Sequence, residues 1–181
     1  MHDLWDYDLS HPPILADMEY ENGIFKSVIV VGKTGNVHIL HRYSGKHLFS
    51  KTFSKVKQSS LPGEISSKYQ ININKPEKLI DLGSYEKQIK RKDYLKNEKN
   101  LKSSLDYIDF GFFHPPSFGK KLITLGLHGG ATWPGSSFNP LKNMLFTPVN
   151  NLPFQLKIEA RSQSKKKPLS KFLSLYENKC S

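Results

Sequence analysis

Short apolar runs alternate with turn residues over the N-terminal part of the chain. Four runs have the β-branched and apolar character of strands: residues 14–18, 26–31 and 37–40, with a further strand beginning at 47–49. Asn22-Gly23, between the first two runs, is a strong hairpin signal because both residues tolerate a positive φ. This alternation of strands and turns predicts an antiparallel meander.

The pattern changes over residues 54–108, which are polar and rich in lysine. The helical periodicity within this excursion predicts a helix over 84–101, and so long an excursion is usually functional or flexible. Gly, Pro and aromatic residues return from Phe110 onward, and the last stretch, 170–178, has the pattern of a helix start. Three further strands are predicted at 121–125, 144–149 and 155–159.

Regularly spaced short strands with glycine-rich corners indicate an all-β fold. The pattern alone does not choose among a sandwich, a barrel and a propeller. Segments 28–46 and 122–153 each pair a strand with a turn and a second strand, as successive propeller blades do, but their similarity does not establish a repeat.

Basic residues outnumber acidic ones by 27 to 16, which gives a net charge of +11 over 181 residues. The excess is concentrated at 87–102 and 165–171, and the first of these segments also contains acidic residues. Interrupted charge runs favour solvated connections, whereas a phosphate-binding surface needs a localised patch. No nucleic-acid partner is expected on this pattern.

The chain has one cysteine, Cys180, so no disulfide can form within it. No apolar run approaches the roughly 20 residues that span a bilayer. Residues 1–13 are acidic and aromatic rather than basic and then apolar, unlike a signal peptide. Any export signal is expected to lie outside this sequence.

Three segments together carry a resemblance to a known family. They are residues 2–8 (HDLWDYD), 31–46 (VGKTGNVHILHRYSGK) and 129–133 (GGATW), the last followed by Asn139-Pro140 and by 145–150. In this order and spacing they resemble the quinoprotein dehydrogenases that use pyrroloquinoline quinone (PQQ), which include glucose and alcohol dehydrogenases. His41 stands where the family usually has Asp, and Thr132 where many members have Asn or Glu.

The resemblance implies an incomplete portion of an eight-bladed β-propeller, roughly its middle third, interrupted by the Lys-rich excursion. Residues 1–160 would form the partial propeller and 161–181 a linker. Leu175–Ser181 is similar to the lead-in to a Cys-x-x-Cys-His haem c attachment site, so a truncated cytochrome c segment is one interpretation of the C-terminal residues. A portion of a closed ring leaves exposed edges and is expected to be inactive by itself.

The resemblance also assigns roles to acidic residues near the N-terminus. Oxidation of an alcohol requires a base for the hydroxyl proton beside the carbonyl that accepts the hydride, and Asp6 matches the family's base. Asp8 lies where some relatives add a carboxylate to the metal site, so Asp6 and Asp8 are candidate ligands of Ca²⁺, or of a lanthanide. Alternation along an extended segment would put both carboxylates on one face.

Three further residues are candidate cofactor contacts by the same resemblance. Lys33 matches the cation that binds the quinone oxygens and stabilises negative charge as the quinone is reduced. Trp133 would line the cofactor pocket, and Asn150 would contact the cofactor. Taken singly, each motif also fits an ordinary turn or packing corner. The shared order favours the functional interpretation for Asp6 and Lys33 and leaves both open for the other candidates.

The function implied is that of a periplasmic dehydrogenase, soluble or membrane-associated, that oxidises an alcohol or a sugar with PQQ. A quinone or a cytochrome c would accept the electrons. An alternative is a non-catalytic, propeller-like binding module that kept the motifs without the cofactor. The combination of Asp6, Asp8 and Lys33 argues against this alternative, because a scaffold has no need of a base beside a cation. A basic nucleic-acid-binding protein is a third alternative, supported by net charge alone.

Overall fold

The structure is a computed structural model that describes residues 3–81, 108–125, 128–150 and 154–158. All regular elements in these ranges are strands, so the prediction of an all-β chain is confirmed there. The part of the chain that is described contains no helix long and apolar enough to cross a membrane. The helices predicted at 84–101 and 170–178, the proposed linker 161–181 and Cys180 lie outside the described residues.

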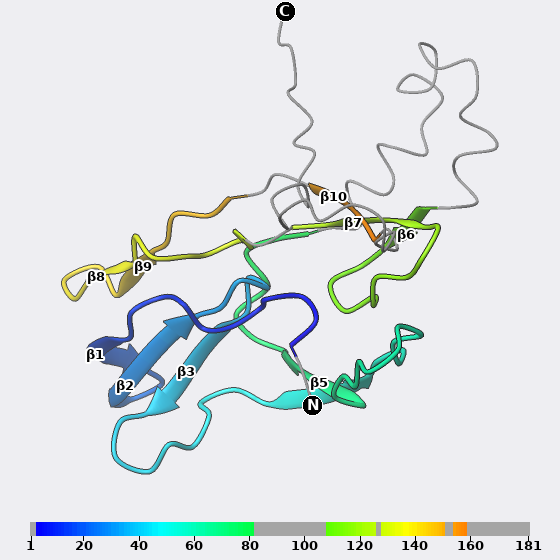
Figure 1. Cartoon of the computed structure of the whole chain (residues 1–181). Helices are drawn as coiled ribbons and strands as arrows, with labels where there is room; N and C mark the ends of the chain where they lie inside the picture. The colour runs from blue at the N-terminus through cyan, green and yellow to red at the C-terminus, as the bar shows by residue number, and fades with distance from the viewer. Residues whose placement is uncertain (1–2, 82–107, 126–127, 151–153, 159–181) are drawn as a thin grey trace, which may run out of the picture.

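The first sheet is an antiparallel meander in the order β1–β2–β3 and occupies the lower left of Figure 1. Its strands are β1 (Ile14–Tyr20), β2 (Gly23–Val31) and β3 (Val37–His41), as the sequence predicted. The hairpin turns at Glu21–Asn22, one residue before the expected Asn22-Gly23, because Gly23 already pairs with Tyr20. Glu21 takes the positive φ of this turn, at 52°.

The next strand was predicted to begin at 47–49, and that prediction is wrong, because the strand begins at Lys51. Only His47 bridges to Leu40, and the amide of Leu48 then donates to the carbonyl of Ile39 over 2.8 Å. Leu48 and Phe49 both pack against the hydrophobic core. Neighbouring residues of a regular strand point to opposite faces. Two neighbours that pack against the same core are therefore not part of a regular strand.

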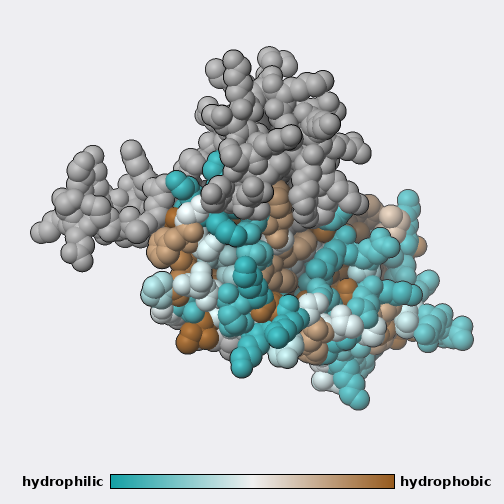
Figure 2. Space-filling view, turned by 90° about the vertical axis from the view of Figure 1, so that its right-hand side faces the viewer, coloured by the Kyte–Doolittle hydropathy of each residue, from teal (hydrophilic) through white to brown (hydrophobic). Residues whose placement is uncertain are grey.

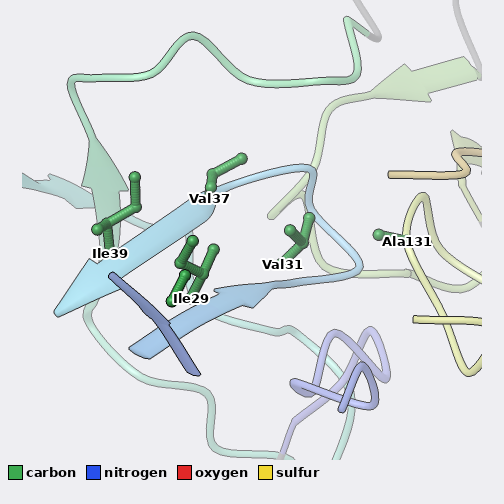
Figure 3. Close-up of a cluster of buried hydrophobic side chains, with 6 residues drawn as sticks. Ile29, Val31, Val37, Ile39 and Ala131 are labelled. Carbon is green, nitrogen blue, oxygen red and sulfur yellow. The ribbon is translucent and has the colours of Figure 1, made fainter. Parts of the chain in front are cut away.

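One face of the meander forms the main hydrophobic core, which Figure 3 shows. Ile29 and Val31 of β2 alternate with more exposed residues, and Val37 and Ile39 of β3 do the same beside them. Ala131, from a loop far along the chain, joins the cluster, and its side chain is fully buried. Alternation with period two therefore sets which face is buried, as expected of a half-buried sheet.

A hairpin within the polar region was missed by the sequence analysis. It consists of β4 (Lys51–Lys55) and β5 (Tyr69–Ile73), which pair antiparallel. Every residue of β4 is exposed, so the strand has no apolar alternation to reveal it. Backbone pairing and polar side chains hold it instead, including a 2.5 Å hydrogen bond from the Asn72 amide to the Ser54 hydroxyl.

A mixed sheet in the order β10–β7–β6 lies at the upper right of Figure 1. β7 (Lys121–Thr124) pairs antiparallel with β10 (Phe154–Lys157) and parallel with β6 (Ile108–Phe110). The strands predicted at 121–125 and 155–159 are thus present with slightly different ends. β6 was missed because three residues are too few to show a period.

The last hairpin joins β8 (Ser137–Asn139) to β9 (Met144–Phe146). The strand predicted at 144–149 ends early, since β8 offers only three partners and Pro148 has no N–H to donate. Asn143 in the connecting turn fastens the hairpin to the edge of β1. Its side chain accepts from the Glu19 amide over 3.1 Å and donates to the Glu19 carbonyl over 2.8 Å.

Hydrophobic and hydrophilic side chains are interspersed over the face of the molecule in Figure 2. Several large apolar side chains are well exposed, among them Leu141 at 95% and Leu15 at 65%. A cavity of about 770 Å³ lies between the core face of the meander and the β8–β9 hairpin, with Ile29, Val37 and Leu145 in its wall. Some apolar surface of the described residues is thus exposed to solvent.

Candidate functional site

The N-terminal segment makes a tight loop around Asp6. The carboxylate of Asp3 accepts a hydrogen bond from the Trp5 amide at 3.1 Å and another from the Tyr7 amide at 2.8 Å. Asp6, between these two amides, has a φ of 56°, in the left-handed region that Asp and Asn adopt more readily than most residues. The segment is therefore a closed turn and not the extended segment with alternating side chains that was predicted.

Two aromatic side chains anchor this loop to the rest of the molecule. The Trp5 indole is buried, donates to the His114 carbonyl over 2.9 Å, and meets Phe113 edge-on with ring centroids 5.4 Å apart. The Tyr7 hydroxyl forms a short hydrogen bond with the Thr124 hydroxyl. Burial raises the pKa of Tyr7, and the Thr124 hydrogen bond opposes that rise. The side chains of Trp5 and Tyr7 thus anchor the loop on either side of Asp6.

The carboxylates of Asp6 and Asp8 both meet the ammonium group of Lys33. The Lys33 Nζ lies 3.0 Å from Oδ2 of Asp6 and 2.6 Å from Oδ1 of Asp8. The lysine side chain is 7% exposed, whereas those of Asp6 and Asp8 are 52% and 56% exposed. A buried cation therefore lies beneath two carboxylates that remain open to a ligand.

The charge state of Lys33 reflects two opposing effects. Burial lowers the pKa of its ammonium group, because the charged form loses solvent. The hydrogen bonds to Asp8 and Asp6 and the attraction of their charges outweigh burial, and the net pKa lies above the usual 10.5. Lys33 is therefore a fixed cation near neutral pH.

The turn after β2 explains why a lysine is buried here. The Gly35 amide donates to the Gly32 carbonyl over 2.8 Å, and Gly35 takes a φ of 77°. Gly129 and Gly130 then pass directly over the turn, and an added Cβ at Gly129 would lie 2.5 Å from Cγ of Lys33. Only a residue without a side chain fits at this distance, so Gly129 packs against the aliphatic part of the lysine, while Gly130 packs against Ile80 and the Lys33 carbonyl.

The other two predicted cofactor contacts, Asn150 and Trp133, differ in how close they lie to the Lys33 cluster. The amide of Asn150 donates to the Gly130 carbonyl over 2.6 Å, which brings Asn150 to the segment that covers Lys33. Trp133 is 80% exposed, so within the described residues it lines no enclosed pocket. The role of Asp3 and the packing of Gly129 and Gly130 were not predicted from the sequence. The available signals were the spacing of Asp3 from Trp5 and Tyr7, and the adjacent glycines 129 and 130.

The donor chemistry of the cluster suits a quinone cofactor. An ammonium group has three N–H bonds, and the carboxylates of Asp6 and Asp8 account for two among the described residues, which leaves one for a carbonyl oxygen. Carboxylates are also the hard ligands that Ca²⁺ takes, but Ca²⁺ needs about six to eight oxygens. The described part of the chain holds no cluster of three or more His, Cys, Asp or Glu side chains that could bind a metal. Further metal ligands would have to come from elsewhere.

The chain belongs to the PQQ-dependent dehydrogenase family: the model of its glucose/ethanol/alcohol dehydrogenase β-propeller domain matches residues 1–177. The meander β1–β2–β3 and the other small sheets are accordingly parts of an incomplete propeller, as the resemblance implied. PQQ is the cofactor that membership of this family implies.

Characterised relatives agree with this family. The chain is 31% identical over 163 residues to quinoprotein glucose dehydrogenase A of Acinetobacter calcoaceticus, which covers 84% of the chain and 20% of that protein. It is 26% identical over 170 residues to quinate/shikimate dehydrogenase (quinone) of Acinetobacter baylyi, covering 90% of the chain and 20% of the relative. The chain thus spans about a fifth of the length of these relatives, less than the third expected. No solved structure matches the chain.

Proposed function

We propose that the chain supplies the catalytic base and a quinone-binding cation to a PQQ-dependent dehydrogenase that oxidises an alcohol or a sugar. The observation that carries this proposal is the 3.0 Å contact between the Lys33 Nζ and the Asp6 carboxylate, in a chain of this family. A base and a cation in contact, one exposed and the other buried, are the two groups that the reaction needs side by side.

Each residue has a defined task in this proposal. Asp6 accepts the proton of the substrate hydroxyl, while the carbon of the same CH–OH group gives up a hydride. PQQ supplies the two-electron acceptor. Lys33 would hold a quinone oxygen of the bound cofactor and would stabilise negative charge there, and its raised pKa keeps it cationic.

Asp8 and Asp6 together provide carboxylate oxygens for a metal ion, with Ca²⁺ as the first candidate and a lanthanide as the alternative. The exposure of these side chains, 52% for Asp6 and 56% for Asp8, supports this part of the proposal, since it leaves the carboxylates accessible to an ion. Asn150 would contact the cofactor through the segment that covers Lys33. Trp133 would line the pocket only with further protein around it.

The names of the relatives guide the choice of substrate and acceptor. The two relatives are named as dehydrogenases of glucose and of quinate or shikimate, and the name of the second specifies a quinone. We propose a sugar or a cyclic polyol as substrate and a quinone as electron acceptor, with cytochrome c as the alternative. A periplasmic location, soluble or membrane-associated, and a haem c segment after Cys180 remain part of the proposal.

The test uses the protein encoded by the complete reading frame that contains this chain. It is loaded with PQQ and either Ca²⁺ or a lanthanide, and dye reduction is measured with sugars, polyols and simple alcohols. The variant Asp6→Asn keeps the shape and tolerates the positive φ, and it should lose at least about 100-fold in kcat. Asp17→Asn is the matched control, because Asp17 is 55% exposed and pairs with Arg42 away from the cluster.

The alternative function makes a different prediction for the same experiment. A folded, complete protein that neither binds PQQ nor reduces dye would be a non-catalytic, propeller-like binding module. Activity that Asp6→Asn leaves unchanged would exclude Asp6 as the base and still retain the family.

A further inference from the structure

One carboxylate outside the proposed catalytic set shapes the loop that contains it. Asp3 uses its two oxygens on two different amides, those of Trp5 and Tyr7, at 3.1 and 2.8 Å. These amides lie on either side of Asp6 in the sequence. A single side chain therefore closes the backbone around the residue proposed as the base.

The loop needs such a closure because its geometry is unfavourable for the free chain. Asp6 has a φ of 56°, a left-handed conformation that is unfavourable for residues other than glycine relative to the ordinary regions. The side chains of Trp5 and Tyr7 anchor the loop on either side of the Asp6 backbone. The Asp3 hydrogen bonds act on that backbone directly, since they satisfy the amides that the turn brings together.

We propose that Asp3 is a positioning residue that holds the carboxylates of Asp6 and Asp8 on the Lys33 ammonium group. Asp3 binds the backbone amides of Trp5 and Tyr7, so it acts on Lys33 through the backbone of its neighbours. The catalytic consequence of this arrangement rests on the proposed function. The Asp3 hydrogen bonds and the contacts of Asp6 and Asp8 with Lys33 need no cofactor.

The reactivity of Lys33 with an acylating reagent reports the arrangement in the cofactor-free chain. The reagent must reach the amine, and the Lys33 side chain is 7% exposed, with the carboxylates of Asp6 and Asp8 on its Nζ. A displaced loop removes these two partners and exposes the amine, so the acylation rate rises.

The experiment compares Asp3 variants by mass spectrometry of the acylated chain. Asp3→Ala removes both acceptors, whereas Asp3→Asn keeps one carbonyl oxygen and folds most like the natural chain. We expect the rate at Lys33 to rise in the order natural chain, Asp3→Asn, Asp3→Ala, with a severalfold increase in the last. Lys78, which donates to Asn72 over 3.1 Å, is the internal reference for general unfolding.

Two further variants complete the design. The double variant Asp6→Asn, Asp8→Asn removes both partner charges and should give the highest rate at Lys33, and Asp17→Ala should leave it unchanged. Natural rates at Lys33 in both Asp3 variants would overturn the proposal. A double variant at the natural rate would overturn it as well, because Lys33 would then be protected by burial alone.

Measurements on the complete enzyme separate this proposal from the proposed function. Asp3→Asn is expected to lower kcat severalfold with little change in KM, since the base is misplaced while substrate contacts are kept. A natural enzyme without PQQ-dependent activity would contradict the proposed function but not the acylation result. An active enzyme whose Asp3 variants keep the natural kcat and the natural acylation rate would contradict the positioning role alone.

Discussion

The amide of Gly130 donates a hydrogen bond to the carbonyl of Lys33 over 2.7 Å. These two residues belong to motifs that are far apart in the sequence, and this bond makes them neighbours at the site. The carbonyl of Gly130 in turn accepts from the Asn150 amide over 2.6 Å. The backbone of one glycine therefore connects the buried lysine to a third segment.

This close approach predicts that Gly129→Ala is strongly destabilising. The new methyl group would lie 2.5 Å from Cγ of Lys33, and Gly129 has a φ of 58°, which disfavours any side chain. We expect a loss of about 2–4 kcal/mol in the free energy of unfolding, from backbone strain and overpacking together. Urea denaturation followed by fluorescence measures it.

Gly63→Ala is the matched control for that substitution. Gly63 has a φ of 81°, but an added Cβ there would meet nothing within 4 Å. Its expected cost is about 1 kcal/mol, from the backbone alone. Equal losses in the two variants would show that contact with Lys33 is unimportant.

The raised pKa of Lys33 predicts a loss of stability in alkaline solution. Because the folded chain holds the proton more tightly, the stabilisation is complete below the usual pKa of 10.5 and disappears as the pH rises through the higher folded value. Lys33→Met fills similar space without a charge, so its unfolding free energy should fall less above pH 10.5. Denaturation at a series of alkaline pH values tests this, and Tyr7, which also has a raised pKa, contributes equally to both proteins.

His38 predicts the opposite dependence in mild acid. Burial of the ring lowers its pKa below the usual 6.5, and the charges of His47 and Lys51 lower it further. The stabilisation is therefore present above pH 6.5 and is lost as the pH falls through the lower folded value. Urea midpoints at pH 7.5 and 5.5 should differ less in His38→Gln than in the natural chain. Lys51→Gln should reduce the difference in part, and an unchanged difference in His38→Gln would refute this account.

The two tryptophans are expected to report different environments. Trp5 is 7% exposed and Trp133 is 80% exposed. In the chain by itself, Trp133→Phe should leave blue-shifted emission that acrylamide barely quenches, whereas Trp5→Phe should leave red-shifted, readily quenched emission. If Trp133 lines the cofactor pocket of the complete protein, adding PQQ should reduce its quenching by acrylamide. No change on adding PQQ would remove Trp133 from the pocket.

Local pattern was sufficient for much of the fold. Ile29, Val31, Val37 and Ile39 alternate with more exposed residues, so the strands and their buried face followed from the sequence. β4 escaped notice because its five residues are all exposed, and its stability comes from pairing with a distant strand. The strand predicted at 144–149 ended early because its partner β8 has three residues, whereas β1 and β2 extend beyond their predicted ends because they pair with each other as far as Tyr20 and Gly23.

The candidate site was likewise predicted in part from the sequence. Family order in the sequence was enough to select Asp6, Asp8 and Lys33, and the structure brings their charged groups into contact. Their roles in catalysis remain predictions.

Residue type, motif order and period are properties of the chain itself, so the sequence determined the all-β class, the family resemblance and the candidate residues. The tertiary structure alone decided that Asp3 closes the loop, that the two glycines cover Lys33 and that Trp133 is exposed here. These facts depend on contacts between residues that are distant in sequence or on the reach of a side chain to a particular backbone amide. No local pattern encodes such distances, because packing of the whole chain sets them.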